Sequence, residues 1–273
     1  MRHVDSGGKQ YHIACERGDL AGYLLVPGDP DRVDRIMRFW DSADEVSSRR
    51  EFRSFRGKYR GVPISVLSSG IGPACMAIAV NEAANVGVHT FIRVGTTAAI
   101  QKGIACGAVV ISSAAVRLDC TSNCYIMPEY PAAANYEVLL ALIQAAEGLN
   151  AQDYHVGVTA TTADFYAGQS RVTAKGYCGE NENLLPVLQK AGVLNFEMET
   201  ATLFTLASLY GLRAASVCAV VSNRCTNEFK AGAGEEAAIR IANEAVRVLY
   251  EWDKLKKKAG KSWLFPSLLR SAR

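Results

Sequence analysis

Short runs of aliphatic and β-branched residues alternate along this chain with stretches of helical periodicity. Such alternation is typical of an α/β fold, in which helices cover a sheet. We interpret as strands the runs at residues 23–26, 62–67, 90–94, 108–111, 155–159 and 216–221. Helical patterns fall at residues 31–40, 73–86, 136–147, 200–210 and 235–255. The chain is therefore expected to form a central β-sheet flanked by helices.

The chain can form one large hydrophobic core, because 49% of its 273 residues are hydrophobic. No break in composition divides the sequence into separate domains. We expect a single domain over residues 1–253. After it, lysines crowd together and are followed by Trp263 and Phe265. Residues 254–273 are expected to form a solvated basic tail. The alternative is that Trp263 and Phe265 dock on a neighbouring subunit.

Charge and cysteine patterns exclude several classes of protein. A net charge of +3, without a long basic stripe before residue 254, argues against a nucleic-acid binder. No apolar run approaches the ~18 residues that span a bilayer, and residues 1–12 lack the apolar stretch of a signal peptide. We expect a cytoplasmic protein with mostly buried, free cysteines. Cys120 and Cys124 lack the second pair of a zinc site, so no metal site is expected.

Polar and glycine residues follow several expected strands, at the point where each strand ends. They form the groups Gly28-Asp29, Ser69-Gly70, Gly95-Thr96-Thr97 and Ser222-Asn223-Arg224. In open α/β sheets, ligands bind outside the carboxyl ends of the strands. These groups predict one site assembled from several loops. The run at residues 69–73 lacks the third glycine of a dinucleotide-binding loop, so no nicotinamide cofactor is expected.

The segment at residues 27–32, Pro-Gly-Asp-Pro-Asp-Arg, follows one strand and begins a helix. Gly28 lets the backbone approach a ligand closely, and the N–H groups of a helix N-terminus attract anions. Arg32 lies in the first helical turn, and Arg93 ends another apolar strand just before Thr96. Guanidinium groups bind phosphate through paired hydrogen bonds. An anion site is one interpretation; taken alone, residues 27–32 fit an ordinary tight turn better.

A pair of acidic residues, Glu197 and Glu199, precedes an apolar helix. If the backbone is extended there, both carboxylates point the same way and can accept hydrogen bonds from the two hydroxyls of a ribose. The alternative is a helix N-terminus, where acidic residues are favoured and Asn195 is the cap. The segment supports the two interpretations equally.

Phe165, Gln169 and Arg171 lie in a run that resembles a loop. A planar base needs an aromatic face for stacking, and the amide of Gln169 matches the adjacent N–H and carbonyl of uracil. Arg171 is suited to donate a hydrogen bond to a second carbonyl. Taken alone, the run is more simply an ordinary surface loop.

In this order, these segments resemble the nucleoside phosphorylase superfamily, and within it the uridine phosphorylases. The resemblance runs from about Tyr11 to about Leu249, through the motifs PGDPDRV (27–33), REF (50–52), FIRVGTTAAIQ (91–101), FYAGQSR (165–171) and NFEMETATL (195–203). It implies a nucleoside phosphorylase-like fold with a mixed sheet, and a homo-oligomer whose active sites are shared between subunits. It also implies uridine and phosphate as substrates, with no organic cofactor.

The resemblance assigns roles to individual residues. It implies a phosphate site made of Gly28, Arg32, Arg93, Thr96 and, from a neighbouring subunit, Arg50. The ribose site would consist of Thr97, Glu197, Met198, Glu199 and, across the interface to the 5′-hydroxyl, His12. The base site would consist of Phe165, Gln169, Arg171 and Arg224. The expected catalytic residues are Arg171, Gln169, Arg93 and Glu199.

Some positions differ from the family's usual residues, and one distinguishes its purine enzymes from its pyrimidine enzymes. The family's monovalent-cation site uses a glutamate, a carbonyl and a serine; Glu51 and Ile71 are in place here, but Cys75 replaces the serine, which puts cation binding in doubt. Purine enzymes of the family place an acidic aspartate where this chain has Asn223. Because Asn223 cannot protonate a purine, uracil is favoured. The segment 172–194 looks slightly short, which leaves the flap beside the base undefined.

The expected reaction is the reversible phosphorolysis of uridine to uracil and ribose 1-phosphate, in pyrimidine nucleoside salvage and catabolism. Positioning and electrostatic stabilisation would carry it, without a covalent enzyme intermediate. Two alternatives stay open: a hydrolytic nucleosidase, which would not need the arginines, and a nucleoside-binding paralogue without turnover. The sequence also leaves open the tolerance for deoxyribose and thymine, and a dimer versus a trimer of dimers.

Overall fold

The computed structural model describes residues 4, 7–177 and 183–270. Within them, one sheet contains the strands β1 (Tyr23–Val26), β2 (Ser42–Arg49), β3 (Phe52–Tyr59), β4 (Val62–Leu67), β5 (Thr90–Ala99), β6 (Val109–Leu118), β7 (Ala132–Ala133), β8 (Tyr154–Thr162), β9 (Asn195–Glu197), β10 (Arg213–Asn223) and β11 (Glu228–Phe229). The helices are α1 (Asp31–Met37), α2 (Pro73–Asn85), α3 (Tyr136–Gly148), α4 (Leu184–Lys190), α5 (Thr200–Leu209), α6 (Glu235–Ala259) and α7 (Pro266–Arg270). Short 3₁₀ turns are η1 (Ser122–Cys124), η2 (Ala167–Gln169) and η3 (Ala174–Gly176).

The sheet is mixed, and part of it closes into a ring. The strand order is β11-β10-β6-β8-β9-β5-β1-β4-β3-β2, with β7 paired to β6. A further parallel pairing joins β10 to β5, so β5, β10, β6, β8 and β9 pair around a closed circuit. β1 pairs in parallel with β4 and β5, whereas β2, β3 and β4 pair antiparallel. The expected α/β fold with a mixed central sheet is confirmed.

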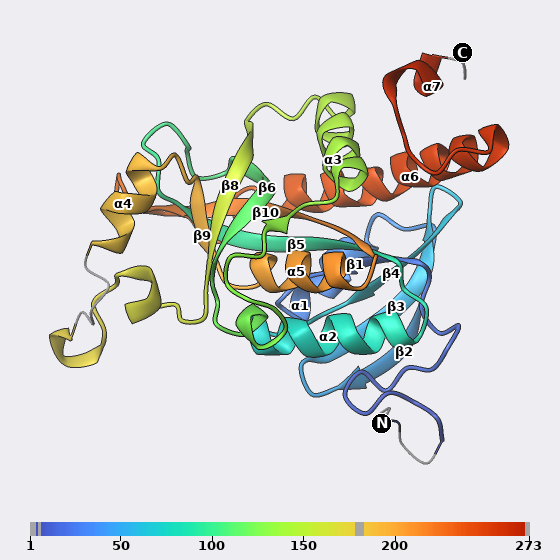
Figure 1. The fold of residues 1–273 in the computed structure, drawn as a ribbon, viewed down its shortest axis with the longest axis horizontal. Coiled ribbons are helices and arrows are strands. Elements are labelled where there is room, and N and C mark those ends of the chain that lie inside the picture. The colour runs from blue at the N-terminus through green and yellow to red at the C-terminus, as the bar shows by residue number, and fades with distance from the viewer. Residues whose placement is uncertain (1–3, 5–6, 178–182, 271–273) are drawn as a thin grey trace.

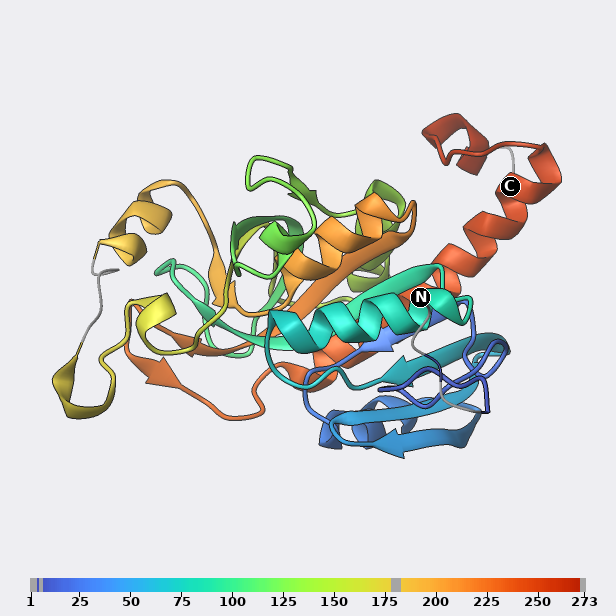
Figure 2. The same cartoon turned by 60° about the horizontal axis from the view of Figure 1, so that its bottom comes forward.

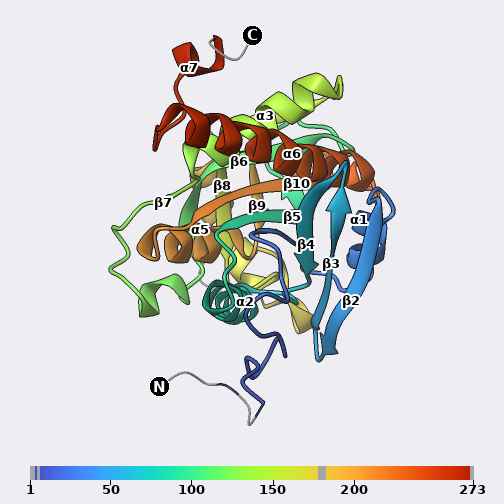
Figure 3. The ribbon, with the colours of Figure 1, turned by 90° about the vertical axis from the view of Figure 1, so that its right-hand side faces the viewer.

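Helices cover both faces of the sheet (Figures 1 and 3). α1, α3 and α6 pack on one face, where Tyr23 and Leu25 of β1 join their apolar core. α2 and α5 pack on the other face, together with Leu24 and Val26. Because successive side chains of a strand point to opposite faces, β1 is covered on both sides and needs an unbroken apolar run. That run made β1 predictable.

Several strands differ in extent from the expectation. β5 continues through Gly95-Thr96-Thr97, and β10 continues to Asn223, so these residues belong to strands rather than to the loops beyond them. The sequence pattern does not predict β2 and β3, whose sequences SADEVSSR and FRSFRGKY are polar and basic. β2 is the edge strand and is mostly exposed, which is where charged side chains are tolerated.

The expected boundary after residue 253 falls inside α6, which continues to Ala259. The prediction of a solvated tail is wrong for Lys256, because its ammonium nitrogen lies 2.5 Å from Glu137 Oε2 and 3.1 Å from Asp253 Oδ1. A buried lysine needs such partners, since an unpaired buried charge is costly. Beyond α6, Leu264 is buried and its N–H donates to Glu137 at 3.0 Å.

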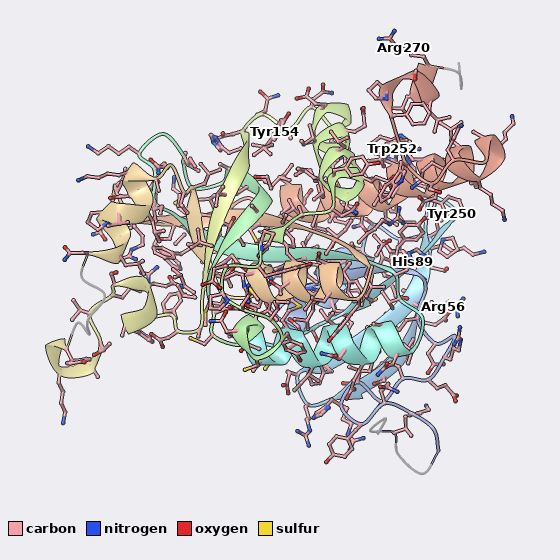
Figure 4. The ribbon with its side chains drawn as sticks, viewed as in Figure 1. Arg56, His89, Tyr154, Tyr250, Trp252 and Arg270 are labelled. Atoms are coloured by element: carbon pink, nitrogen blue, oxygen red, sulfur yellow. The ribbon has the colours of Figure 1, made fainter. Side chains whose placement is uncertain are left out.

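Arg213, the first residue of β10, joins the same group of charges. Its guanidinium lies 3.1 Å from Glu137 and 2.7 Å from Asp253. We call Glu137, Arg213, Asp253 and Lys256 the clasp, because they tie α3, β10 and α6 together. His89 and Tyr250, labelled in Figure 4, lie at this end of the molecule, where both rings pack edge-on against Tyr23.

Cysteines in the described part of the chain are all free thiols. The expectation that they are mostly buried is wrong for these residues: Cys15 and Cys218 are buried, but Cys75, Cys106 and Cys225 are only partly buried, and Cys120 and Cys124, at and just before the surface turn η1, are exposed. No helix among the described residues is long and apolar enough to cross a membrane.

Candidate active site

A cavity of about 310 Å³ opens where β1, β5 and β10 end, between these strands, β9 and the loop around η2. The η2 and α4 region lies at the far end of the molecule from the C-terminal part of α6 (Figures 1 and 2). Most of the predicted site residues line this one cavity: Gly28, Arg32, Arg93, Thr96, Thr97, Phe165, Gln169, Arg171, Glu197, Met198 and Glu199. Segments as far apart in the sequence as Gly28 and Glu199 therefore meet, as the strand-end pattern predicts.

Arg93 on β5 is the central charge of the cavity. It is only 4% exposed, its Nε donates to Glu197 Oε2 at 2.9 Å, and its Nη2 contacts Glu199. Burial alone would lower the pKa of Arg93, but the charges of Glu199 and Glu197 raise it above the ordinary value. Its third nitrogen, Nη1, is buried without a hydrogen-bond partner among the described residues. Arg93 is therefore a fixed cation with one unused donor.

Gly28 lies beside Arg93. A Cβ atom added at Gly28 would stand 3.2 Å from the carbonyl oxygen of Gly70 and 4.0 Å from Arg93 Nη1. A larger residue would therefore crowd the space next to the free donor. The expectation that the N-terminus of α1 offers free N–H groups is wrong, because the N–H groups of residues 31–33 already donate to Asp29 and Pro30.

Arg32 reaches the cavity from α1 and is 6% exposed. Its Nη1 donates to the carbonyl of Val94, and its Nε lies 3.3 Å from Glu235 at the beginning of α6. Glu235 also binds Arg35, at 2.5 Å. Arg32 is thus oriented by a carboxylate that sequence reasoning missed, since 203 residues separate the two.

The two acidic residues have different surroundings. The extended interpretation holds for residues 195–197, which form β9, whereas Glu199 is the N-cap residue of α5, so the helix N-terminus interpretation holds for Glu199; Asn195 is not the cap. The carboxylate of Glu197 accepts from Arg93, from the hydroxyl of Thr161 and from the N–H groups of residues 199 and 200. Its role in this structure is to hold Arg93 and the beginning of α5. Glu199 accepts from Arg93 and from the N–H of Gly72 at 2.6 Å.

Burial raises the pKa of Glu199 above its ordinary value, an effect that Arg93 opposes and Glu197 reinforces. Near it, the hydroxyl of Thr97 donates to the carbonyl of Phe196 at 2.6 Å. Thr96 and Met198 are half-buried in the cavity wall. This part of the cavity therefore presents acidic and hydroxyl groups beside an arginine.

The loop around η2 supplies an aromatic ring, an amide and a guanidinium. Arg171 lies over the ring of Phe165, 4.5 Å from its centroid, and burial lowers the pKa of Arg171. Gln169 is 2% exposed. Gln169 Oε1 and Arg171 Nε are buried without a hydrogen-bond partner in the part of the chain that the structure describes. Residues 178–182 of the possible flap at 172–194 lie outside the described residues.

Arg224 does not line the cavity. It donates to the backbone carbonyls of Gln169 and Ser170, at 3.2 Å for Ser170, and so supports the loop from behind. Asn223 also turns away: its amide donates to the carbonyls of Gln101 and Ile104, and its oxygen accepts two N–H groups of the following turn.

His12 and Arg50 are outside the cavity as well, side by side on another surface. Tyr11 links them, because its ring lies 4.9 Å from the ring of His12 and 5.6 Å from the guanidinium of Arg50. Near this surface, the thiol of Cys75 lies 3.5 Å from Glu51. Sequence reasoning missed two wall residues: Phe229, because the short β11 resembles a surface turn, and Val221, which is one more apolar residue of β10.

Comparison with known proteins identifies the family to which this chain belongs. The model of the phosphorylase superfamily matches residues 23–250. The chain is 55% identical to a uridine phosphorylase of Thermococcus kodakarensis, over 96% of this chain and 94% of that protein. It is 41% identical to a uridine phosphorylase of Escherichia coli (88% and 97%) and 35% identical to a guanosine phosphorylase of Halorubrum lacusprofundi (88% and 99%). By its fold, its cavity and these similarities, the chain belongs to the phosphorylase superfamily.

Proposed function

We propose that this chain catalyses the reversible phosphorolysis of uridine to uracil and ribose 1-phosphate, in cytoplasmic pyrimidine nucleoside salvage and catabolism. One observation carries the proposal: Arg93 Nη1, Gln169 Oε1 and Arg171 Nε are buried without a hydrogen-bond partner among the described residues, and all three belong to residues of one cavity. Leaving a buried polar atom unpaired costs about 1–3 kcal/mol. Such atoms are explained when a ligand supplies their partners.

Phosphate is proposed to bind between Gly28, Arg32, Arg93 and Thr96. The free donor of Arg93 and the close backbone approach at Gly28 suit an oxyanion. Glu199, held against Arg93, would accept hydrogen bonds from ribose hydroxyls, with Thr97 and Met198 beside the sugar. No organic cofactor is needed in this scheme, because phosphate itself is the nucleophile.

The base is proposed to lie against Phe165, with Gln169 and Arg171 at its edge. As the glycosidic bond lengthens, negative charge builds up on uracil and positive charge on the sugar. Arg171 would stabilise the leaving base, and bound phosphate would stabilise and then capture the sugar. Arg224 would act indirectly, through the carbonyls of the loop that it supports.

A pyrimidine is favoured over a purine, although one relative of 35% identity is a guanosine phosphorylase. The side chain of Asn223 is turned into the protein and its amide is fully engaged, so it offers no acid to a purine ring. A nucleoside panel at saturating phosphate tests this choice. We expect a higher kcat/KM for uridine than for inosine or guanosine; a purine nucleoside as the best substrate would overturn the assignment.

We further propose a homo-oligomer in which His12 and Arg50 serve the cavity of a neighbouring subunit. Support comes from their position: both lie on one surface, next to Tyr11, and neither lines the cavity of its own chain. Mixing His12→Ala chains with Glu199→Ala chains, after dissociation and reassociation, should restore activity above both parents, because a mixed pair contains one native site. Verified mixed pairs without that gain would show that His12 acts within its own chain or not at all.

A further inference from the structure

Both carboxylate oxygens of Glu82, near the end of α2, contact the dipeptide His12-Ile13. The residue is 8% exposed. Its Oε2 accepts the backbone N–H groups of His12 and Ile13, each at 2.9 Å, and its Oε1 contacts His12 Nδ1 at 2.6 Å. Residues 7–22 form neither a helix nor a strand, so no regular element fixes His12. A carboxylate 70 residues away does so instead.

The contact with Nδ1 determines how the imidazole is presented. A neutral histidine carries its proton on one ring nitrogen, and a carboxylate partner selects the nitrogen that it contacts. Because Glu82 is an acceptor, Nδ1 carries the proton, which leaves Nε2 as the hydrogen-bond acceptor of the ring. The ring is held further by the edge-on contacts with Tyr11 and Phe52, at centroid distances of 4.9 and 6.3 Å. The His12 side chain remains 28% exposed.

From these contacts we infer that Glu82 is a positioning residue: it orients His12 and sets its tautomer, so that Nε2 faces the ribose 5′-hydroxyl in the neighbouring subunit. The inference rests on the shared site proposed above. Glu82 itself touches no substrate. A glutamine at this position would replace one acceptor oxygen with a donor NH₂, and at least one of the three N–H groups would lose its acceptor.

The test compares uridine with 5′-deoxyuridine, which lacks the hydroxyl that His12 is proposed to bind. The measured quantity is the ratio of kcat/KM for the two substrates. His12→Ala should lower this ratio by about 3- to 10-fold, as expected for one hydrogen bond. Glu82→Gln should lower it similarly, and the double variant no further than His12→Ala alone, because both changes remove the same interaction.

Asn85→Ala is the matched control. Asn85 lies one turn after Glu82 and ties α2 to the same segment by donating to Gln10 at 3.0 Å, without touching His12. It should leave the ratio unchanged, so a general loosening of the segment is distinguished from loss of orientation. If His12→Ala lowers the ratio and Glu82→Gln does not, the role of Glu82 is refuted. If His12→Ala leaves the ratio unchanged, the proposed contact of His12 with the 5′-hydroxyl fails and this inference fails with it.

A second measurement needs no variant of Glu82. The nitrogen shifts of ¹⁵N-histidine-labelled protein report the tautomer of each of the four histidines, and His12→Ala identifies the relevant signal. Where the ring is neutral, we expect the proton on Nδ1. A neutral ring with its proton on Nε2 would contradict the inference even if Glu82→Gln did not fold.

Discussion

Two groups of charges, the clasp around Arg213 of β10 and the cavity around Arg93 of β5, differ in how completely they are paired. In the clasp, the guanidinium of Arg213 contacts Asp253, Glu137 and the hydroxyl of Thr90, and Lys256 contacts both carboxylates. In the cavity, Arg93 contacts two carboxylates, but its Nη1 has no hydrogen-bond partner in the part of the chain that the structure describes. A closed network only holds the fold together, whereas an open one keeps a donor for a ligand. The completeness of pairing therefore separates the structural group from the functional one.

The largest effect is expected in the clasp. Arg213→Met should destabilise the protein by about 3–5 kcal/mol, because Glu137 and Asp253 lose a charged partner inside the fold. The activity of the molecules that stay folded should be unchanged. Chemical denaturation followed by fluorescence measures the free energy of unfolding, and active-site titration corrects the rate.

The control is Arg240→Met, which removes an exposed arginine whose partner Glu236 is 3.9 Å away. It should cost less than about 1 kcal/mol. If Arg213→Met is no more destabilising than this control, the clasp does not stabilise the fold.

The second largest effect is expected in the cavity, where a substitution should lower activity and leave stability nearly unchanged. Arg171→Ala should lower kcat/KM for uridine by roughly 10- to 200-fold, the equivalent of about 1.5–3 kcal/mol for a charge-assisted hydrogen bond. Its Nε is unpaired in the described structure, so the free energy of unfolding should change by less than about 1 kcal/mol. Lys175→Ala, an exposed cation of the same region, is the control and should retain normal kinetics. Unchanged kinetics of Arg171→Ala would remove Arg171 from the base site.

The smallest expected effect is a pH dependence of the stability that the clasp contributes. Burial alone would raise the pKa of Asp253, but hydrogen bonds from Arg213 and Tyr23 lower it from 3.8 to about 2. A lowered carboxyl pKa contributes stability that is present above the unfolded value and is lost as the pH falls toward the folded value. The difference in unfolding midpoint between wild type and Asp253→Asn should thus be constant above about pH 5 and shrink between about pH 4 and 2.

Glu251→Gln on the same helix is the control for that pH series, because Glu251 is exposed and contacts only Lys254, at 3.3 Å, among its ion pairs in the described residues. Its curve should run close to that of the wild type throughout. A wild-type advantage over Asp253→Asn that persists unchanged down to pH 2 would argue against the ionised form of Asp253 as its source.

The sequence predicts the cavity better than the clasp, and the reason is physical. Strands such as β5 and β10 are covered on both faces, so their apolar runs are visible, and ligand residues gather where these strands end. The edge strand β2 is mostly exposed, and β9 is three residues long, so neither has a readable pattern. The family resemblance then adds roles, such as that of His12, which no local pattern indicates.

Apart from the i,i+3 spacing of Asp253 and Lys256 on α6, the clasp has no local signal. Arg213 meets Asp253 across 40 residues and Glu137 across 76, and the pattern of either helix alone only indicates a charged position. The lysines after residue 253 indicate a solvated tail, because composition cannot reveal that Lys256 turns inward to a carboxylate on α3. Glu82 and Glu235 were missed for the same reason, since each binds a residue far away in the chain.

The most direct test of the central claim, that the open cavity uses phosphate as its nucleophile, is uracil release from uridine with and without phosphate. The enzyme is first freed of phosphate, and the sugar product is identified at each phosphate concentration. We expect release only with phosphate, saturation as the site fills, and ribose 1-phosphate as the product. Equal rates in both conditions, with free ribose as the product, would contradict the account and identify a hydrolase.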